Sequence, residues 1–201
     1  MDQAAVSAAL NCLERAKEAL ASLENGGSFD KMEGAWTDFL VMANRVYVKL
    51  EQGAKVSGKS KAWFGRKKSE RRNDPLLSYI KNARDADEHG LARITERTSG
   101  SIGVNATEGV PWSGHIKSTE IGAEISLHSD APGASATFSI TPPNVRLVEV
   151  VNYGDRYPAP TTHMGNPVPN PVLNAYPHPV AVGQLAVSHL DALIAEARAL
   201  P

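Results

Sequence analysis

Two long amphipathic segments, separated by a pair of glycines, restrict the fold of this chain more than any other feature. Apolar side chains recur at three- and four-residue steps over residues 3–24 and again over residues 29–52. This spacing is typical of helices that bury one face. Because the glycine pair leaves only a short connection, we expect the two helices to lie antiparallel, with Ser28 or Asp30 capping the second.

Two further helices are predicted. Residues 74–97 show the same apolar periodicity, and they begin with Asp74, a good helix cap, and Pro75, which the first helical position tolerates well. Residues 179–201 also begin with a proline and carry an apolar stripe. Three N-terminal helices and one C-terminal helix predict an arrangement like a four-helix bundle.

Short runs rich in β-branched residues lie between the third and fourth predicted helices. We expect antiparallel strands in four places: residues 101–107, 115–128, 136–141 and 145–153. Prolines then recur over residues 158–179, which disfavours a helix and indicates an extended connection. The predicted fold class is therefore α+β and mainly helical, with a small antiparallel β insertion. The expected organisation is a helical bundle with a basic loop at 53–73 (1–99), a β-rich insertion with the proline-rich connection (100–178) and a C-terminal helix that packs on the bundle (179–201).

Composition indicates an ordinary globular protein, since 42% of the 201 residues are hydrophobic and 21% are charged. The chain has no run of 18 apolar residues, and its first residues do not resemble an export signal. We therefore expect a cytoplasmic protein without a membrane partner. Cys12 is the only cysteine and the histidines are scattered, so we expect no disulfide, no metal site and no cofactor.

The formal net charge of −1 hides a strongly basic segment. Residues 55–72 contain a single acid, Glu70, and carry a formal charge of +7 against −8 in the remainder. Such a segment could contact a phosphate backbone, and Trp63 within it could stack on an unpaired base. The alternative is a solvated loop between helices. The candidate RNA-binding residues are Lys59, Lys61, Trp63, Arg66, Lys67, Lys68, Arg71 and Arg72.

The third predicted helix carries an arginine followed five residues later by a histidine, in the string Arg84-Asp85-Ala86-Asp87-Glu88-His89. Asp85 and His89 are four residues apart, so on a helix they could form a hydrogen bond that fixes the imidazole tautomer. A histidine that titrates near pH 6.5 and a permanently charged arginine can together move protons and stabilise negative charge. RNA contains its own nucleophile, the 2′-hydroxyl, so these two functions would suffice for cleavage without a metal.

This string, placed on a helix of a helical bundle, resembles the HEPN superfamily, whose signature is an arginine, a polar residue and a histidine four to six residues after the arginine. The resemblance is limited to residues of about 3–97. It implies a metal-independent endoribonuclease or an RNA-binding protein, assembled as a homodimer in which two motif helices meet. Arg84 would then stabilise the transition-state charge, His89 would act as general acid or base, and Asp85 would orient His89.

Three other interpretations remain open from the sequence. Arg84 could simply pair with Glu88 on a solvated helix face, which would leave a non-catalytic interaction module whose β insertion binds a protein or a small ligand. Residues 53–60 fit the phosphate-binding pattern G-x4-G-K-[ST], but a predicted helix precedes them where that motif requires a strand. Residues 148–158 place polar and aromatic side chains near a turn, where they could line a cleft.

Overall fold

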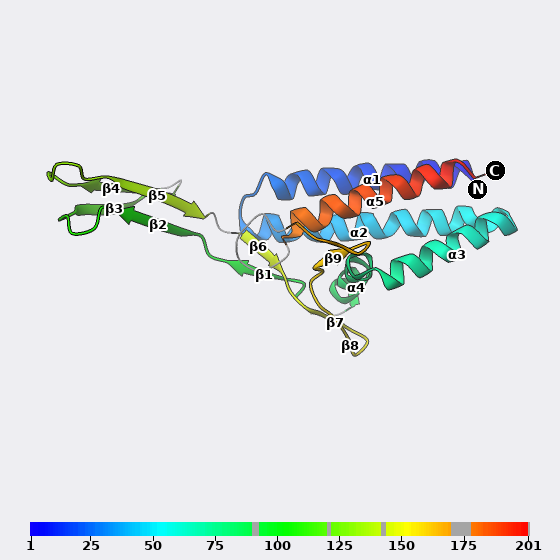
Figure 1. Ribbon diagram of the computed structural model, residues 1–201. Helices are drawn as coiled ribbons and strands as arrows, with labels where there is room; N and C mark the ends of the chain where they lie inside the picture. Colours follow the sequence, from blue (N-terminus) through cyan, green and yellow to red (C-terminus); the bar gives the residue numbers. More distant parts are fainter. Residues whose placement is uncertain (90–92, 120–121, 142–143, 170–177, 201) are drawn as a thin grey trace. The chain divides into compact units, whose positions relative to one another are not determined.

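The computed structural model describes residues 1–89, 93–119, 122–141, 144–169 and 178–200 (Figure 1). These residues form five α-helices and ten short strands, which pair in antiparallel twos. The fold is therefore α+β and mainly helical, as predicted. The chain divides into two compact units, of which the larger comprises Met1–Thr98 with Asn144–Pro201 and the smaller Ser99–Pro143.

The first two helices confirm the prediction from hydrophobic periodicity. Helix α1 spans Gln3–Glu24 and helix α2 spans Phe29–Gly53, and they pack along each other in Figure 1. Ser28 caps α2, because its hydroxyl accepts a hydrogen bond from the Lys31 amide. Both glycines of the intervening turn have positive φ, at 68° and 134°, which explains why glycine is needed there.

The predicted basic loop over residues 53–73 is wrong, because this segment is mostly helical. A short 3-10 helix, η1, spans Ala54–Val56, and helix α3 follows over Gly58–Asn73 with Ser57 as its cap. Charged residues make up so much of α3 that only a narrow face of this helix is buried. That face consists of Ser60, Trp63 and Phe64, and contacts with distant helices complete it.

The predicted helix over residues 74–97 is also too long. Helix α4 spans Pro75–His89 and begins as predicted, since a carboxylate oxygen of Asp74 accepts a hydrogen bond from the Leu77 amide at 2.9 Å. Strand β1, Thr95–Thr98, lies where the prediction continued the helix, and it pairs with strand β6, Asn144–Leu147. Pairing with a segment about 50 residues away overrides the local helical pattern.

Two short hairpins complete the larger unit beside the helices. Strands β7, Val150–Asn152, and β8, Asp155–Tyr157, form the first, so the strand predicted over residues 145–153 is divided between β6 and β7. Strands β9, Thr162–His163, and β10, Asn166–Pro167, form the second within the predicted proline-rich connection. The remainder of that connection, residues 170–177, lies outside the described residues.

The smaller unit consists of two antiparallel strand pairs. Strand β2, Ser101–Ala106, pairs with β5, Ala136–Thr141, and β3, Ser113–Thr119, pairs with β4, Gly122–His128. The single run predicted over residues 115–128 is therefore two strands. No side chain described within this unit is buried, so the hydrophobic core belongs to the larger unit.

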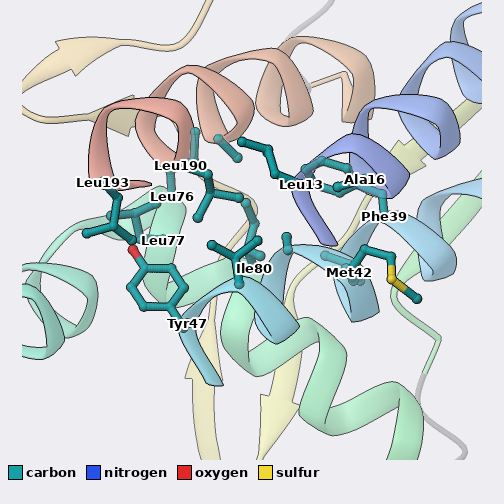
Figure 2. Packing of buried hydrophobic residues seen from close by; sticks show 14 of the residues in the cluster. Leu13, Ala16, Phe39, Met42, Tyr47, Leu76, Leu77, Ile80, Leu190 and Leu193 are labelled. Atoms are coloured by element: carbon teal, nitrogen blue, oxygen red, sulfur yellow. The ribbon is translucent and has the colours of Figure 1, made fainter. Parts of the chain in front are cut away.

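Helix α5, Pro179–Arg198, closes the core against α1 and α2. Figure 2 shows its Leu190 and Leu193 beside Leu76, Leu77 and Ile80 of α4. Among the helices that the structure describes, α5 is the one whose length and composition would allow it to cross a membrane. Its apolar side chains are instead those that pack on its neighbours, as is usual for a core helix.

Candidate anion-binding site between α3 and α4

A cavity of about 440 Å³ lies between α3 and α4 and is lined mainly by positively charged side chains. Helix α3 contributes three cations to it, α4 contributes a cation and two polar residues, and β8 contributes an aromatic ring. The lining residues are Lys68, Arg71, Arg72, Ser78, Lys81, Asn82 and Tyr157. Four cations around one cavity provide the charge that a phosphate group requires.

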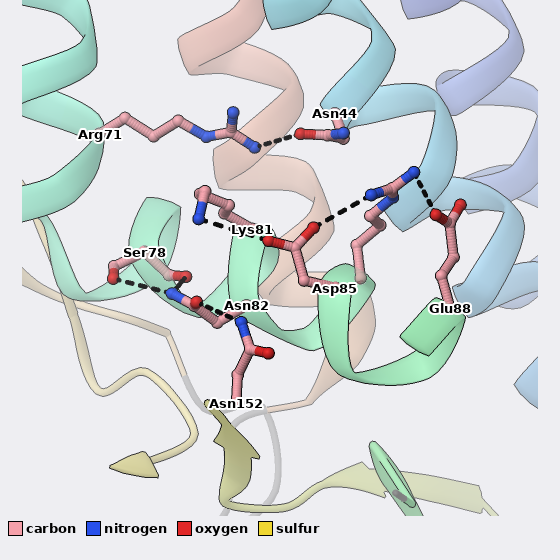
Figure 3. Close-up of polar contacts among 9 residues, drawn as sticks. Asn44, Arg71, Ser78, Lys81, Asn82, Asp85, Glu88 and Asn152 are labelled. Atoms are coloured by element: carbon pink, nitrogen blue, oxygen red, sulfur yellow. Dashed lines mark hydrogen bonds and ion pairs between the residues drawn. The ribbon is translucent and has the colours of Figure 1, made fainter. Parts of the chain in front are cut away.

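Arg71 differs from the other cations of the cavity because it is half-buried and forms no ion pair with a carboxylate of the described chain. One Nη donates a hydrogen bond to Asn44 Oδ1 at 2.9 Å (Figure 3). The guanidinium also lies 4.0 Å from the centre of the Tyr47 ring. Burial lowers the pKa of Arg71, although the group remains charged. A neutral amide and an aromatic face compensate a buried cation only in part. The carboxylates of Asp85 and Glu51 also favour the charged guanidinium from a distance, and a bound anion could contact it directly.

The floor of the cavity is fixed by a chain of hydrogen bonds between α4 and β7. Asn82, which is only 5% exposed, donates a hydrogen bond from Nδ2 to the carbonyl oxygen of Ser78 at 2.8 Å. Its Oδ1 accepts a hydrogen bond from Asn152 Nδ2 at 2.9 Å (Figure 3). The β7–β8 hairpin, and with it Tyr157, is thereby attached to α4.

The other cations of the cavity differ in how strongly acids neutralise them. Lys68 pairs with Glu51 at 2.9 Å, and Lys81 pairs with Asp85 at 3.3 Å, but both lysines remain about half exposed. Arg72 is exposed and forms no ion pair within the described chain. Exposed ion pairs of this kind are weak, and the side chains that line the cavity themselves include four cations and no acid.

The predicted RNA-binding cations of α3 that do not line the cavity differ in whether acids hold them. Lys59, Lys61 and Arg66 are exposed on α3 and make no ion pairs with the residues that the structure describes. Lys67 is held by Glu70 and Glu196, at 3.0 and 2.9 Å.

Trp63 requires a correction, since the sequence predicts that its ring stacks on a base. The side chain is only 4% exposed, and its indole Nε1 donates a hydrogen bond to Glu196 of α5 at 3.0 Å. Trp63 therefore holds α3 against α5 and has no free ring face for a nucleotide.

The predicted catalytic residues lie at the C-terminal half of α4. Arg84 contacts Asp85 at 3.1 Å and forms a second ion pair with Glu88, while Asp85 also pairs with Lys81 (Figure 3). Two carboxylates thus neutralise Arg84. The side chain of His89 lies outside the described part of the chain. Asp85 contacts the cations Lys81 and Arg84, and the predicted contact between Asp85 and His89 lies outside the described residues.

A buried polar network behind the cavity could not be read from the sequence. The Tyr47 hydroxyl lies 3.1 Å from Nε2 of His189, whose ring packs edge-on against that of His163 at 5.6 Å between centroids. His163 Nδ1 lies 3.0 Å from Asp74 Oδ1, and the amide of Met164 donates to the other carboxylate oxygen at 2.7 Å. The network joins α2, α5 and the β9–β10 hairpin to the start of α4.

Electrostatics confirm the structural role of this network. Burial lowers the pKa of His189 and raises the pKa of Tyr47, so both are neutral near pH 7. Burial alone would raise the pKa of Asp74, but hydrogen bonds from Met164, Leu77 and His163 outweigh it and lower that pKa. The contact with Tyr47 gives the His189 imidazole a hydrogen-bond partner inside the protein.

A larger cavity, of about 630 Å³, lies between α2, α4 and β1, but its charges largely satisfy one another. Glu33 accepts hydrogen bonds from Arg97 at 2.7 Å and from Thr95 at 3.2 Å. Arg97 also contacts Asp30. The cavity between α3 and α4 is therefore the better candidate for a ligand site.

The geometry defines a mainly helical α+β protein with a cationic cavity between two of its helices. Comparisons of the chain with protein-family models, with curated proteins and with solved structures gave no match. The resemblance to the HEPN superfamily consequently stays a prediction. In the described part of the chain, no group of three or more histidine, cysteine or acidic side chains could hold a metal ion.

Proposed function

We propose that this protein binds RNA through the cavity between α3 and α4 and the exposed cations of α3. The observation that carries the proposal is Arg71, a half-buried guanidinium without an ion pair in the described chain, in a cavity shared with Arg72, Lys68 and Lys81. A phosphate group would form a direct ion pair and accept paired hydrogen bonds from the guanidinium. RNA is the polyanion that the resemblance to the HEPN superfamily implies.

The length and charge of α3 support a polymeric anion over a single phosphate. Its 16 residues span about 24 Å, a length that several consecutive phosphates of a nucleic acid strand also occupy. Lys59, Lys61 and Arg66 are exposed along this helix outside the cavity. They would add contacts that depend on charge and not on base sequence.

The proposal is tested by measuring RNA affinity as a function of salt. Fluorescence anisotropy with a labelled 20-nucleotide RNA of mixed sequence should show binding that weakens linearly on a log–log salt plot. Arg72→Gln should weaken binding several-fold and lower the slope of that plot by about one unit. Arg15→Gln is the matched control, because Arg15 is an exposed arginine of α1 that does not line the cavity. Equal effects of the two variants, or no binding by the wild-type protein, would exclude the proposal.

Binding is proposed ahead of cleavage because Arg84 is neutralised by Asp85 and Glu88. Metal-independent cleavage has a separate test, which is incubation of the same RNA with the protein in EDTA. Cleavage that both Arg84→Ala and His89→Ala abolish would establish a ribonuclease at the predicted motif. Sedimentation of the protein alone would test the homodimer that the resemblance implies.

A non-catalytic interaction module is the second candidate function, and a feature of the smaller unit favours it. Val104 of β2 lies directly opposite Phe138 of β5, and both side chains are more than 40% exposed. This pair would mark a partner surface if it belongs to a larger contiguous apolar patch. Retention of a specific protein by the wild type but not by Phe138→Ser would support this function.

A further inference from the structure

Tyr153 forms the tip of the β7–β8 hairpin and is the most exposed large hydrophobic residue that the structure describes, at 88%. Its φ angle is +51°, and that of the following Gly154 is +89°. Two consecutive positive φ angles define the tight turn of a two-residue hairpin, which favours asparagine, aspartate or glycine at both positions. An exposed tyrosine therefore disfavours the turn and contributes little to the core, so folding does not explain its presence.

The hairpin that carries Tyr153 is firmly attached to the wall of the cationic cavity. Val150 is buried, and Asn152, directly before the tyrosine, donates its hydrogen bond to Asn82 of α4. Tyr157, opposite Val150 in the strand pair, lines the cavity itself. A strand advances about 3.3 Å per residue, so the turn lies about 10 Å from Tyr157 along the hairpin. The turn that carries Tyr153 is therefore anchored to the same elements that line the cavity, and its ring is free to meet a ligand that extends from the cavity along the hairpin.

A cation-lined cavity and an exposed aromatic ring on one rigid support are the two elements that bind a single nucleic acid strand. Cations hold the phosphates, while the ring stacks on a base of any kind. Bases within an RNA duplex are paired and stacked on one another, so their faces cannot reach such a ring. We infer that the ligand class is single-stranded RNA, with Tyr153 stacking on an unpaired base whose backbone phosphate occupies the cavity. This inference rests on the proposed function.

The exposed position of Tyr153 permits a variant that separates binding from folding. Tyr153→Asn removes the ring and introduces a residue that the turn favours, so stability should stay equal or increase. Affinity for single-stranded RNA should fall about tenfold, while the slope of the salt plot stays unchanged because no cation is removed. Tyr153→Phe should retain binding. Val151→Ala is the matched control, since Val151 is a half-exposed residue of the same hairpin.

The experiment compares these variants by fluorescence anisotropy on a 20-nucleotide single strand and on the corresponding duplex. Loss of affinity by Tyr153→Asn for the single strand alone would support the inference. Equal affinity of Tyr153→Asn and the wild type, or an equal loss on both RNAs, would overturn it and leave the proposed function intact. Failure of the wild-type protein to bind either RNA would overturn the proposed function and the inference together.

Discussion

The Tyr47 hydroxyl and the Nε2 atom of His189 lie 3.1 Å apart in the interior of the larger unit, where they join α2 to α5. Burial lowers the pKa of His189, with smaller effects from His163, Asp74, Lys67 and Glu70. The unfolded chain therefore takes up a proton near pH 6.5 that the folded chain does not, and the free energy of unfolding falls as the pH drops.

This relationship predicts a pH-dependent stability that His189 partly controls. Urea unfolding should show a lower free energy of unfolding at pH 5.5 than at pH 7.5. His189→Gln keeps a side chain able to bond Tyr47 but cannot titrate, so the difference should shrink. A residual difference is expected, because burial also lowers the pKa of His178. An unchanged difference in His189→Gln would show that the pH dependence arises elsewhere.

Tyr47→Phe separates the hydrogen bond from the titration. The variant keeps the ring beneath the Arg71 guanidinium and removes only the hydroxyl, which should lower the free energy of unfolding by about 1 kcal/mol. Because His189 still titrates, the difference between pH 5.5 and pH 7.5 should persist. The same urea series measures both quantities, and Tyr47→Leu, which also loses the contact with Arg71, should cost more.

Asp74 should be one of the most sensitive polar residues of the chain. Its buried carboxylate caps α4 and also holds His163 and Met164 of the β9–β10 hairpin. Asp74→Ala should therefore cost about 2–4 kcal/mol, the sum of a lost cap and buried groups left without partners. The contribution is present above about pH 4 and is lost at lower pH, because the fold lowers the pKa of this carboxyl. Asp2→Ala, which removes an exposed cap from α1, should cost at most about 1 kcal/mol.

Two glycines of α2 should respond to alanine in opposite directions. A Cβ at Gly53 would lie 2.6 Å from Ala5 Cβ, which cannot move without its helix, whereas a Cβ at Gly34 would meet nothing within 4 Å. Gly34→Ala should stabilise the protein by about 0.5–1 kcal/mol through helix propensity. Gly53→Ala should destabilise it by about 1–3 kcal/mol through overpacking. Thermal unfolding of the two variants, measured side by side, would contradict this account if both shifts had the same sign.

Sequence periodicity was sufficient where a helix buries a broad apolar face. Helices α1, α2 and α5 each carry buried residues along most of their length, so local spacing alone gave their positions. Helix α3 has only three buried residues, and its Trp63 and Lys67 are held by Glu196, about 130 residues away. A segment stabilised from such a distance has no local signal that distinguishes it from a charged loop.

The sequence indicates several residues of the candidate site, but it does not indicate how these residues are arranged in space. The density of positive charge in the sequence identifies Lys68, Arg71 and Arg72 as candidates, and helix α3 places all three beside the cavity. The remaining wall, with Lys81 and Tyr157, depends on the packing of α4 and of a hairpin about 75 residues further along the chain. The conformation that exposes Tyr153 depends on a turn that its own residue type disfavours, so turn preferences could not indicate it.

The pairing of β1 with β6 brings together the two positions at which the chain leaves the larger unit and returns to it. Thr98 and Asn144 are direct partners in this pair, so the chain leaves the unit and returns to it at neighbouring positions. A two-residue Asn-Gly turn could join Thr98 directly to Asn144. Residues 99–143 could then be deleted from the gene as one segment. Insertions and deletions could therefore shorten or replace this segment during evolution without altering the residues of the hydrophobic core or of the cationic cavity.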